Sequence, residues 1–135
     1  MKKTLLVIAT GLTLSACASH HSYSHVPKAD PSNPRVSVLG GKQIVVDQEP
    51  LFFAKGVVNV RINWQLPADS KNTFPKDGIT FDRGAVEELV DCRPEKNGLV
   101  FSCLNRHTKP GKYKYTIKLD GEPKVAPLDP VLVND

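Results

Sequence analysis

The sequence predicts an all-β protein, folded as a single antiparallel β-sandwich of about seven strands. Apolar and polar residues alternate over residues 58–66 and again over 113–119, the pattern of strands with one buried face. Eleven prolines and nine glycines occur among 135 residues, and long helical patterns are few. This composition favours short strands joined by turns at close spacing.

Residues 1–16 have the layout of a bacterial export signal. Lys2 and Lys3 precede an apolar run over residues 5–14, which is too short for the roughly 20 residues that cross a bilayer. The sequence Leu14-Ser15-Ala16-Cys17 then resembles the lipobox of bacterial lipoproteins. The resemblance implies cleavage before Cys17, a diacylglycerol on its sulfur and a fatty acyl group such as palmitate on its amino group.

Several acyl chains on Cys17 would anchor the protein stably, whereas one chain is marginal. The next residue is Ala18, and not the aspartate that would resemble an inner-membrane retention signal. The expected location is therefore the bacterial outer membrane, facing the periplasm. The alternative is an ordinary secretory signal in which Cys17 carries no lipid.

Residues 17–34 are expected to form a lipidated, flexible tether, because Pro, Ser, Asn and His dominate residues 18–34. Fully extended, these residues would span about 55–60 Å. His20, His21 and His25 are close enough in sequence to share a metal ion. The simpler interpretation is that the three histidines are polar spacers, since no carboxylate or thiol lies beside them in the strip 20–25.

Residues 35–135 form the predicted sandwich domain. The clearest strand covers 58–66, with Trp64 as a central core residue, and the second covers 113–119. Shorter strands are predicted at residues 35–39, 42–47, 51–53, 79–81 and 131–133. Phe74, within the polar connection 67–78, is expected to anchor that loop; the alternative is an exposed binding residue.

Cys92 and Cys103 flank Asn97-Gly98, a dipeptide that strongly favours a two-residue hairpin turn. In that register the two cysteines face one another, at a Cα separation of roughly 4.5–5.5 Å that a disulfide can bridge. The oxidising periplasm favours the bond. Pro94 falls at a hydrogen-bonded position and has no N–H, so this strand must be an edge strand, or a bulge or longer loop must shift the register.

Two fold families resemble this pattern of strands. An immunoglobulin-like sandwich is expected, although Trp64 precedes both cysteines and the hallmark bridge of that family is missing. The stretch from Cys103 to His107, followed by Gly111, is similar to the copper loop of cupredoxins, which implies a copper site. However, no histidine lies between Asp30 and His107, and the only methionine is Met1, so no metal ligand is assigned.

The sequence predicts a non-enzymatic protein. It contains no G-x-S-x-G, H-E-x-x-H, Walker or G-x-G-x-x-G motif. The adjacent Glu87 and Glu88 point in different directions on either a helix or a strand, so they cannot converge as an acid/base pair. Removal of Lys2 and Lys3 with the leader lowers the formal charge from +4 to +2, which gives no nucleic-acid footprint.

The resulting functional hypothesis is a lipid-anchored periplasmic binding or accessory protein of the cell envelope, with the lipid on Cys17 as its only attached group. Rigid scaffolds commonly present binding loops, and the candidate loop lies next to the predicted disulfide. Its candidate interaction residues are Asn105, Arg106, His107 and Lys109. The alternatives are a copper-binding, cupredoxin-like protein and a purely structural envelope lipoprotein.

Overall fold

The structure, a computed structural model, describes residues 28–135. The predicted signal peptide 1–16, the lipidation site Cys17 and the tether histidines His20, His21 and His25 lie outside the described residues. Within 28–135, no helix is long and apolar enough to cross a membrane.

The described chain is all-β, as the sequence predicts. Its strands are β1 (Val36–Leu39), β2 (Gln43–Val46), β3 (Leu51–Phe53), β4 (Val60–Gln65), β5 (Asn72–Thr73), β6 (Ile79–Phe81), β7 (Leu89–Glu95), β8 (Val100–Asn105), β9 (Gly111–Ile117), β10 (Asp120–Gly121) and β11 (Val131–Asn134). Two 3₁₀ turns, η1 (Arg83–Ala85) and η2 (Lys96–Gly98), precede β7 and β8.

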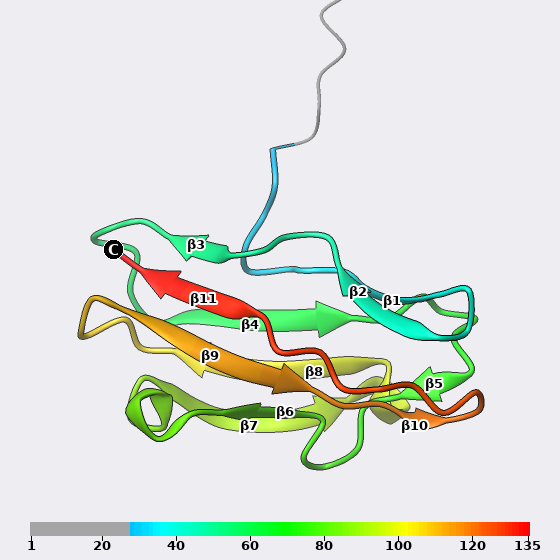
Figure 1. Ribbon diagram of the computed structural model, residues 1–135. Helices are drawn as coiled ribbons and strands as arrows, with labels where there is room; N and C mark the ends of the chain where they lie inside the picture. The colour runs from blue at the N-terminus through cyan, green and yellow to red at the C-terminus, as the bar shows by residue number, and fades with distance from the viewer. Residues whose placement is uncertain (1–27) are drawn as a thin grey trace, which may run out of the picture.

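Two sheets make the layers of the sandwich (Figure 1). One has three strands in the order β4-β8-β7, and the other has four in the order β3-β11-β9-β6. The hairpin β1–β2 and the small pair β5–β10 extend the structure at one end. The strands at the centre of each sheet, β8, β9 and β11, supply inward side chains that meet in a common core.

Trp64 lies at the centre of this core and is fully buried. Its ring centroid is 5.6 Å from that of Tyr115 on β9 and 6.2 Å from that of Phe81 on β6. These tilted aromatic contacts join the two sheets. The predicted burial of Trp64 is confirmed, and so is the alternation along β4, where Ile62 and Trp64 are buried while Gln65 is exposed.

Phe74 anchors the long polar connection, as the sequence suggests. Its side chain is only 3% exposed and packs edge-on against Phe101 at a centroid distance of 5.8 Å. The main-chain N–H of Phe74 donates to the carbonyl of Gly98. Because the ring is buried, it is not an exposed binding residue.

Two features of the fold differ from the sequence-based expectation. The described chain has eleven strands instead of about seven, since two-residue strands such as β5 and β10 are too short to show a period. The sandwich is also not wholly antiparallel, because β3 pairs with β11 in parallel.

The boundary between tether and domain also differs from the prediction. Residues 32–34, which the sequence assigns to the tether, are hydrogen-bonded along β4: the N–H groups of Asn63 and Gln65 donate to the carbonyls of Ser32 and Pro34.

The cysteine hairpin forms as predicted. Asn97 (φ 57°, ψ 33°) and Gly98 (φ 82°) adopt the positive φ angles of a type I′ turn, which the N–H of Leu99 closes by donating to the carbonyl of Lys96. Cys92 and Cys103 are disulfide-bonded, with a Cα separation of 4.1 Å.

Two features of the structure accommodate Pro94, which has no N–H to donate to a neighbouring strand. Its strand β7 is an edge strand of the three-stranded sheet, where a proline is tolerated. The register also shifts between Val90 and Arg93, so a β-bulge places both Asp91 and Cys92 opposite the single residue Cys103.

Candidate functional site

The loop between β8 and β9 is held by the buried carboxylate of Glu88. This side chain is 1% exposed and accepts hydrogen bonds from the N–H of Thr108 at 2.6 Å, the N–H of Lys109 at 3.4 Å and the Thr108 hydroxyl. Burial alone would raise the pKa of Glu88, but the bonds from Thr108 and Lys109 outweigh it, and the pKa is lowered. The loop is therefore fixed by a charged group inside the protein.

His107 holds the same loop from its other side. Its imidazole is 7% exposed, with Nδ1 2.6 Å from the carbonyl oxygen of Val57 and Nε2 3.0 Å from the main-chain oxygen of Asp135. Both ring nitrogens thus face oxygen atoms of the chain. The ring connects three segments: the β3–β4 loop, the β8–β9 loop and the end of β11.

Asn105 and Asn134 form a third buried contact beneath the loop. Their side-chain amides exchange two hydrogen bonds, of 2.8 and 3.1 Å. The Oδ1 of Asn105 also accepts the N–H of His107 at 3.2 Å. Since Asn105 is 0% and Asn134 2% exposed, these amides satisfy one another away from water.

Arg106 and Lys109 are the exposed members of the predicted interaction loop. The Lys109 ammonium lies 3.1 Å from the Glu87 carboxylate, which raises the pKa of Lys109, and Arg106 donates to the main-chain oxygen of Glu87 at 3.4 Å. Such solvent-exposed contacts are weak. The four residues of the predicted site therefore fall into two groups. Asn105 and His107 are buried and support the loop from inside, whereas the side chains of Arg106 and Lys109 are exposed to solvent.

Sequence reasoning missed the role of Glu88. The adjacent carboxylates do point in different directions, with Glu87 exposed and Glu88 buried, and they do not form a pair. The predicted Asn97-Gly98 hairpin pairs β7 with β8 and so brings Glu88 opposite Arg106, whose N–H donates to the Glu88 carbonyl at 2.8 Å. No signal in the sequence shows that the Glu88 side chain turns inward to hold the β8–β9 loop.

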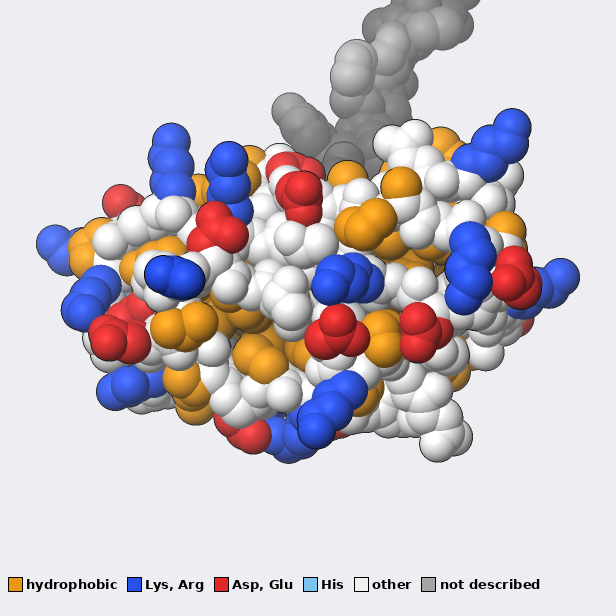
Figure 2. Space-filling view, turned by 60° about the horizontal axis from the view of Figure 1, so that its bottom comes forward, with side chains coloured by type: hydrophobic (Ala, Val, Ile, Leu, Met, Phe, Trp, Pro, Cys, Tyr) orange, Lys and Arg blue, Asp and Glu red, His pale blue; other side chains and the backbone are white. Residues whose placement is uncertain are grey.

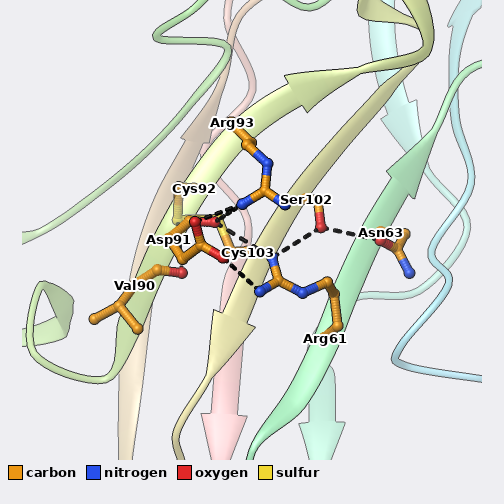
Figure 3. The surroundings of a disulfide bond; sticks show 8 residues. All are labelled: Arg61, Asn63, Val90, Asp91, Cys92, Arg93, Ser102 and Cys103. Carbon is orange, nitrogen blue, oxygen red and sulfur yellow. Dashed lines mark hydrogen bonds and ion pairs between the residues drawn. A yellow bond between two sulfur atoms is a disulfide. The ribbon is translucent and has the colours of Figure 1, made fainter.

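A polar cluster lies next to the disulfide, on the outer side of the three-stranded sheet (Figure 3), whereas Cys103 itself belongs to the buried core. Asp91, in the bulge, accepts from both Arg61, at 2.6 Å, and Arg93. Hydrogen bonds from Arg93 and then Arg61 lower the pKa of Asp91. Arg61 also donates to the hydroxyl of Ser102 at 3.2 Å, so the cluster ties the bulge of β7 across β8 to β4.

The resemblance to a cupredoxin copper loop depends on Cys103 and His107. In the structure Cys103 is disulfide-bonded and 0% exposed, and both nitrogens of His107 face oxygen atoms of the main chain. Between residues 28 and 135, no group of three or more His, Cys, Asp or Glu side chains is placed to hold a metal ion.

An apolar groove lies where the described chain begins. It has a volume of about 740 Å³ and runs between residues 28–31 and residues 47–57. Its apolar lining includes Pro50, Phe52 and Val57, while Asp47 and Glu49 line it on the side of the β2–β3 connection. Gln48 fixes the N-terminal segment next to it by donating to the carbonyl of Asp30 at 2.9 Å.

Basic and acidic side chains are interspersed over the face shown in Figure 2, and neither sign of charge forms a continuous patch on that face. No protein-family model matches the sequence. A comparison with curated proteins finds no match either.

Proposed function

We propose that the protein is a lipid-anchored, non-enzymatic binding protein of the bacterial cell envelope, held at the periplasmic side of the outer membrane through Cys17. The lipobox-like sequence Leu14-Ser15-Ala16-Cys17 supports the anchor. The domain that follows Cys17 is a small sandwich that contains a disulfide bond, and such bonds persist in an oxidising compartment.

One observation favours binding through the β8–β9 loop. The described residues include six buried polar or charged side chains, and four of them, Glu88, Asn105, His107 and Asn134, gather around this loop. Buried polar groups are stabilising only when fully paired, and such networks make a segment rigid. Here they fix a loop whose exposed side chains, Arg106 and Lys109, are cationic, which suits an acidic surface on an envelope partner.

The anchor is tested in cells by labelling with radioactive palmitate. The wild-type protein should incorporate label and sediment with membranes, and Cys17→Ala should do neither. An unlabelled wild-type protein in the soluble periplasmic fraction would disprove the anchor.

The binding loop is tested by a photoreactive amino acid in place of Val86, which is 58% exposed and precedes Glu87, the residue that both Arg106 and Lys109 contact. Crosslinks in living cells are identified by mass spectrometry. A specific partner should disappear in an Arg106→Ala/Lys109→Ala background. Lys42→Ala/Lys124→Ala, which removes two exposed lysines elsewhere, is the matched control. Crosslinks that survive the loop variant would reject this surface, and the absence of any crosslink would favour the structural lipoprotein.

A further inference from the structure

The outer face of the four-stranded sheet carries a compact apolar and basic surface. In the register of the sheet, Val133 on β11 lies between Phe52 on β3 and Lys112 on β9. Val131 lies beside Lys114 in a neighbouring row. We name these five residues the β3–β9 face.

The side chains of this face are available to solvent. Phe52 is 50% exposed, Lys112 and Lys114 are exposed, and Val131 and Val133 are partly buried. Their neighbours on the same strands, Leu51 and Leu132, are fully buried, so the alternation directs Phe52 and the valines outward. Among the described residues, neither lysine has a carboxylate within ion-pair distance.

The β3–β9 face is continuous with the point where the tether enters the domain. Phe52 also lines the groove that Lys28, Ala29 and Pro31 border. Lys28 follows Cys17 by eleven residues, a length that spans at most about 36–40 Å. A lipid on Cys17 would therefore keep this face close to the membrane, at a high effective concentration.

We propose that the β3–β9 face rests on the phospholipid surface, with Phe52 in the interfacial region and Lys112 and Lys114 against lipid phosphates. An aromatic residue among aliphatic and basic ones is the chemistry by which proteins lie on a bilayer without crossing it. The contact is through the sheet face and not the groove, because Asp47 and Glu49 line the groove and anionic headgroups would repel them. This inference rests on the proposed lipid anchor.

A contact through this face orients the domain. The outer side of the three-stranded sheet, with its cluster of Arg61, Asp91 and Arg93, would then be turned away from the lipid. The β1–β2 hairpin would lie at a distance from Phe52 along the length of the domain, because it stands at the other end of the molecule from β3 (Figure 1).

Tryptophan fluorescence tests the orientation in the full-length, lipidated protein, reconstituted into vesicles of phosphatidylethanolamine and phosphatidylglycerol with brominated acyl chains. The native Trp64 is fully buried and gives a constant background. A second tryptophan is placed by Phe52→Trp, or by Leu39→Trp as the control, because Leu39 is 65% exposed on the β1–β2 hairpin. We expect brominated lipid to quench the Phe52→Trp protein at least twofold more strongly than the control, and Lys112→Glu/Lys114→Glu to reduce that difference.

Quenching by aqueous iodide, measured on the same vesicles, shows whether the tryptophan at position 52 is accessible to water. Equal quenching of both tryptophans by brominated lipid would overturn the proposal. So would a tryptophan at position 52 that is shielded from iodide but not quenched by brominated lipid, since a protein partner or a second copy would then cover the face. Mass spectrometry of the N-terminal peptide is run on the same sample: a lipid on Cys17 with no quenching rejects this inference alone, whereas an unmodified Cys17 rejects the anchor.

Discussion

Asn105 and Asn134 are joined by two reciprocal side-chain hydrogen bonds at the buried end of the sandwich, at 2.8 and 3.1 Å. They connect the last residue of β8 with the last residue of β11, which belong to different sheets. This amide pair therefore holds the two layers together directly beneath the β8–β9 loop.

Replacing both members of the pair should cost less than the sum of the two single replacements. Asn134→Ala leaves the Asn105 amide buried without its partner and should lower the free energy of unfolding by about 1–3 kcal/mol. In Asn105→Ala/Asn134→Ala, the loss should be smaller than the sum of the single losses, because neither side-chain amide is left without its partner. The His107 N–H loses its acceptor in both variants that lack Asn105, so this cost does not enter the coupling. Urea denaturation of the four proteins measures the coupling, and strictly additive losses would contradict a buried, reciprocal pair.

Glu88→Gln should destabilise the protein at neutral pH. The hydrogen bonds to the ionised carboxylate hold the pKa of Glu88 below its ordinary value. A lowered pKa means that this stabilisation is complete above the unfolded-state pKa of about 4.3 and is lost as the pH falls through the folded-state pKa. We expect a loss of about 1–3 kcal/mol near pH 7 that shrinks toward pH 3.

The matched control is Glu87→Gln, at the adjacent position. Glu87 is exposed and makes only a surface ion pair with Lys109, so its neutralisation should change stability by less than about 0.5 kcal/mol. Urea denaturation at both pH values distinguishes the two carboxylates. Equal losses for the two variants, or a Glu88→Gln loss that persists unchanged in acid, would refute the assignment.

The sequence predicts the parts of this fold that have a local pattern. The alternation around Trp64 and the Asn97-Gly98 turn each depend on neighbouring residues, and both are confirmed. The facing cysteines follow from the turn, because a two-residue loop sets the register of both strands. Even the conflict at Pro94 is informative, since it predicts an edge strand or a bulge and the structure contains both.

The candidate site could be predicted only in part. The sequence locates the β8–β9 loop, but polarity alone cannot show that Asn105 and His107 turn inward while Arg106 and Lys109 turn outward. That division depends on partners far along the chain, at Val57, Glu88 and the end of β11. The parallel pairing of β3 with β11 is likewise a long-range contact with no local signature.

Removing the disulfide should destabilise the domain without changing its fold. The bond closes a segment with a sequence separation of 11 residues, worth about 3 kcal/mol on the chain-entropy model. Cys92→Ala/Cys103→Ala should therefore unfold at lower urea, while the circular dichroism spectrum stays that of an all-β protein. Wild type measured with and without a reductant is the internal control. A variant as stable as the oxidised wild type would show that the disulfide does not contribute to the stability of the domain.

Tyr115 should make the protein sensitive to alkali. Burial raises the pKa of its phenol, and the side chain is 1% exposed against Trp64. Because the folded-state pKa is raised, the associated stability is complete below the unfolded-state pKa of about 10 and is lost as the pH rises above it. Above that pH, this one group should lower the free energy of unfolding by up to about 1.4 kcal/mol per pH unit.

Tyr115→Phe removes the ionisable group and keeps most of the ring packing. The free energy of unfolding of this variant should fall less steeply between about pH 9 and pH 11 than that of wild type. The variant also loses the hydrogen bond from the Trp64 indole to the phenol oxygen, at 3.4 Å, so the slopes are compared and not the absolute values. Tyr113→Phe is the comparison: burial raises the pKa of Tyr113 as well, but this residue is partly exposed, so its removal should change the slope less. Identical slopes for wild type and Tyr115→Phe would mean that the phenol reaches water in the folded protein, which contradicts its place between the two sheets.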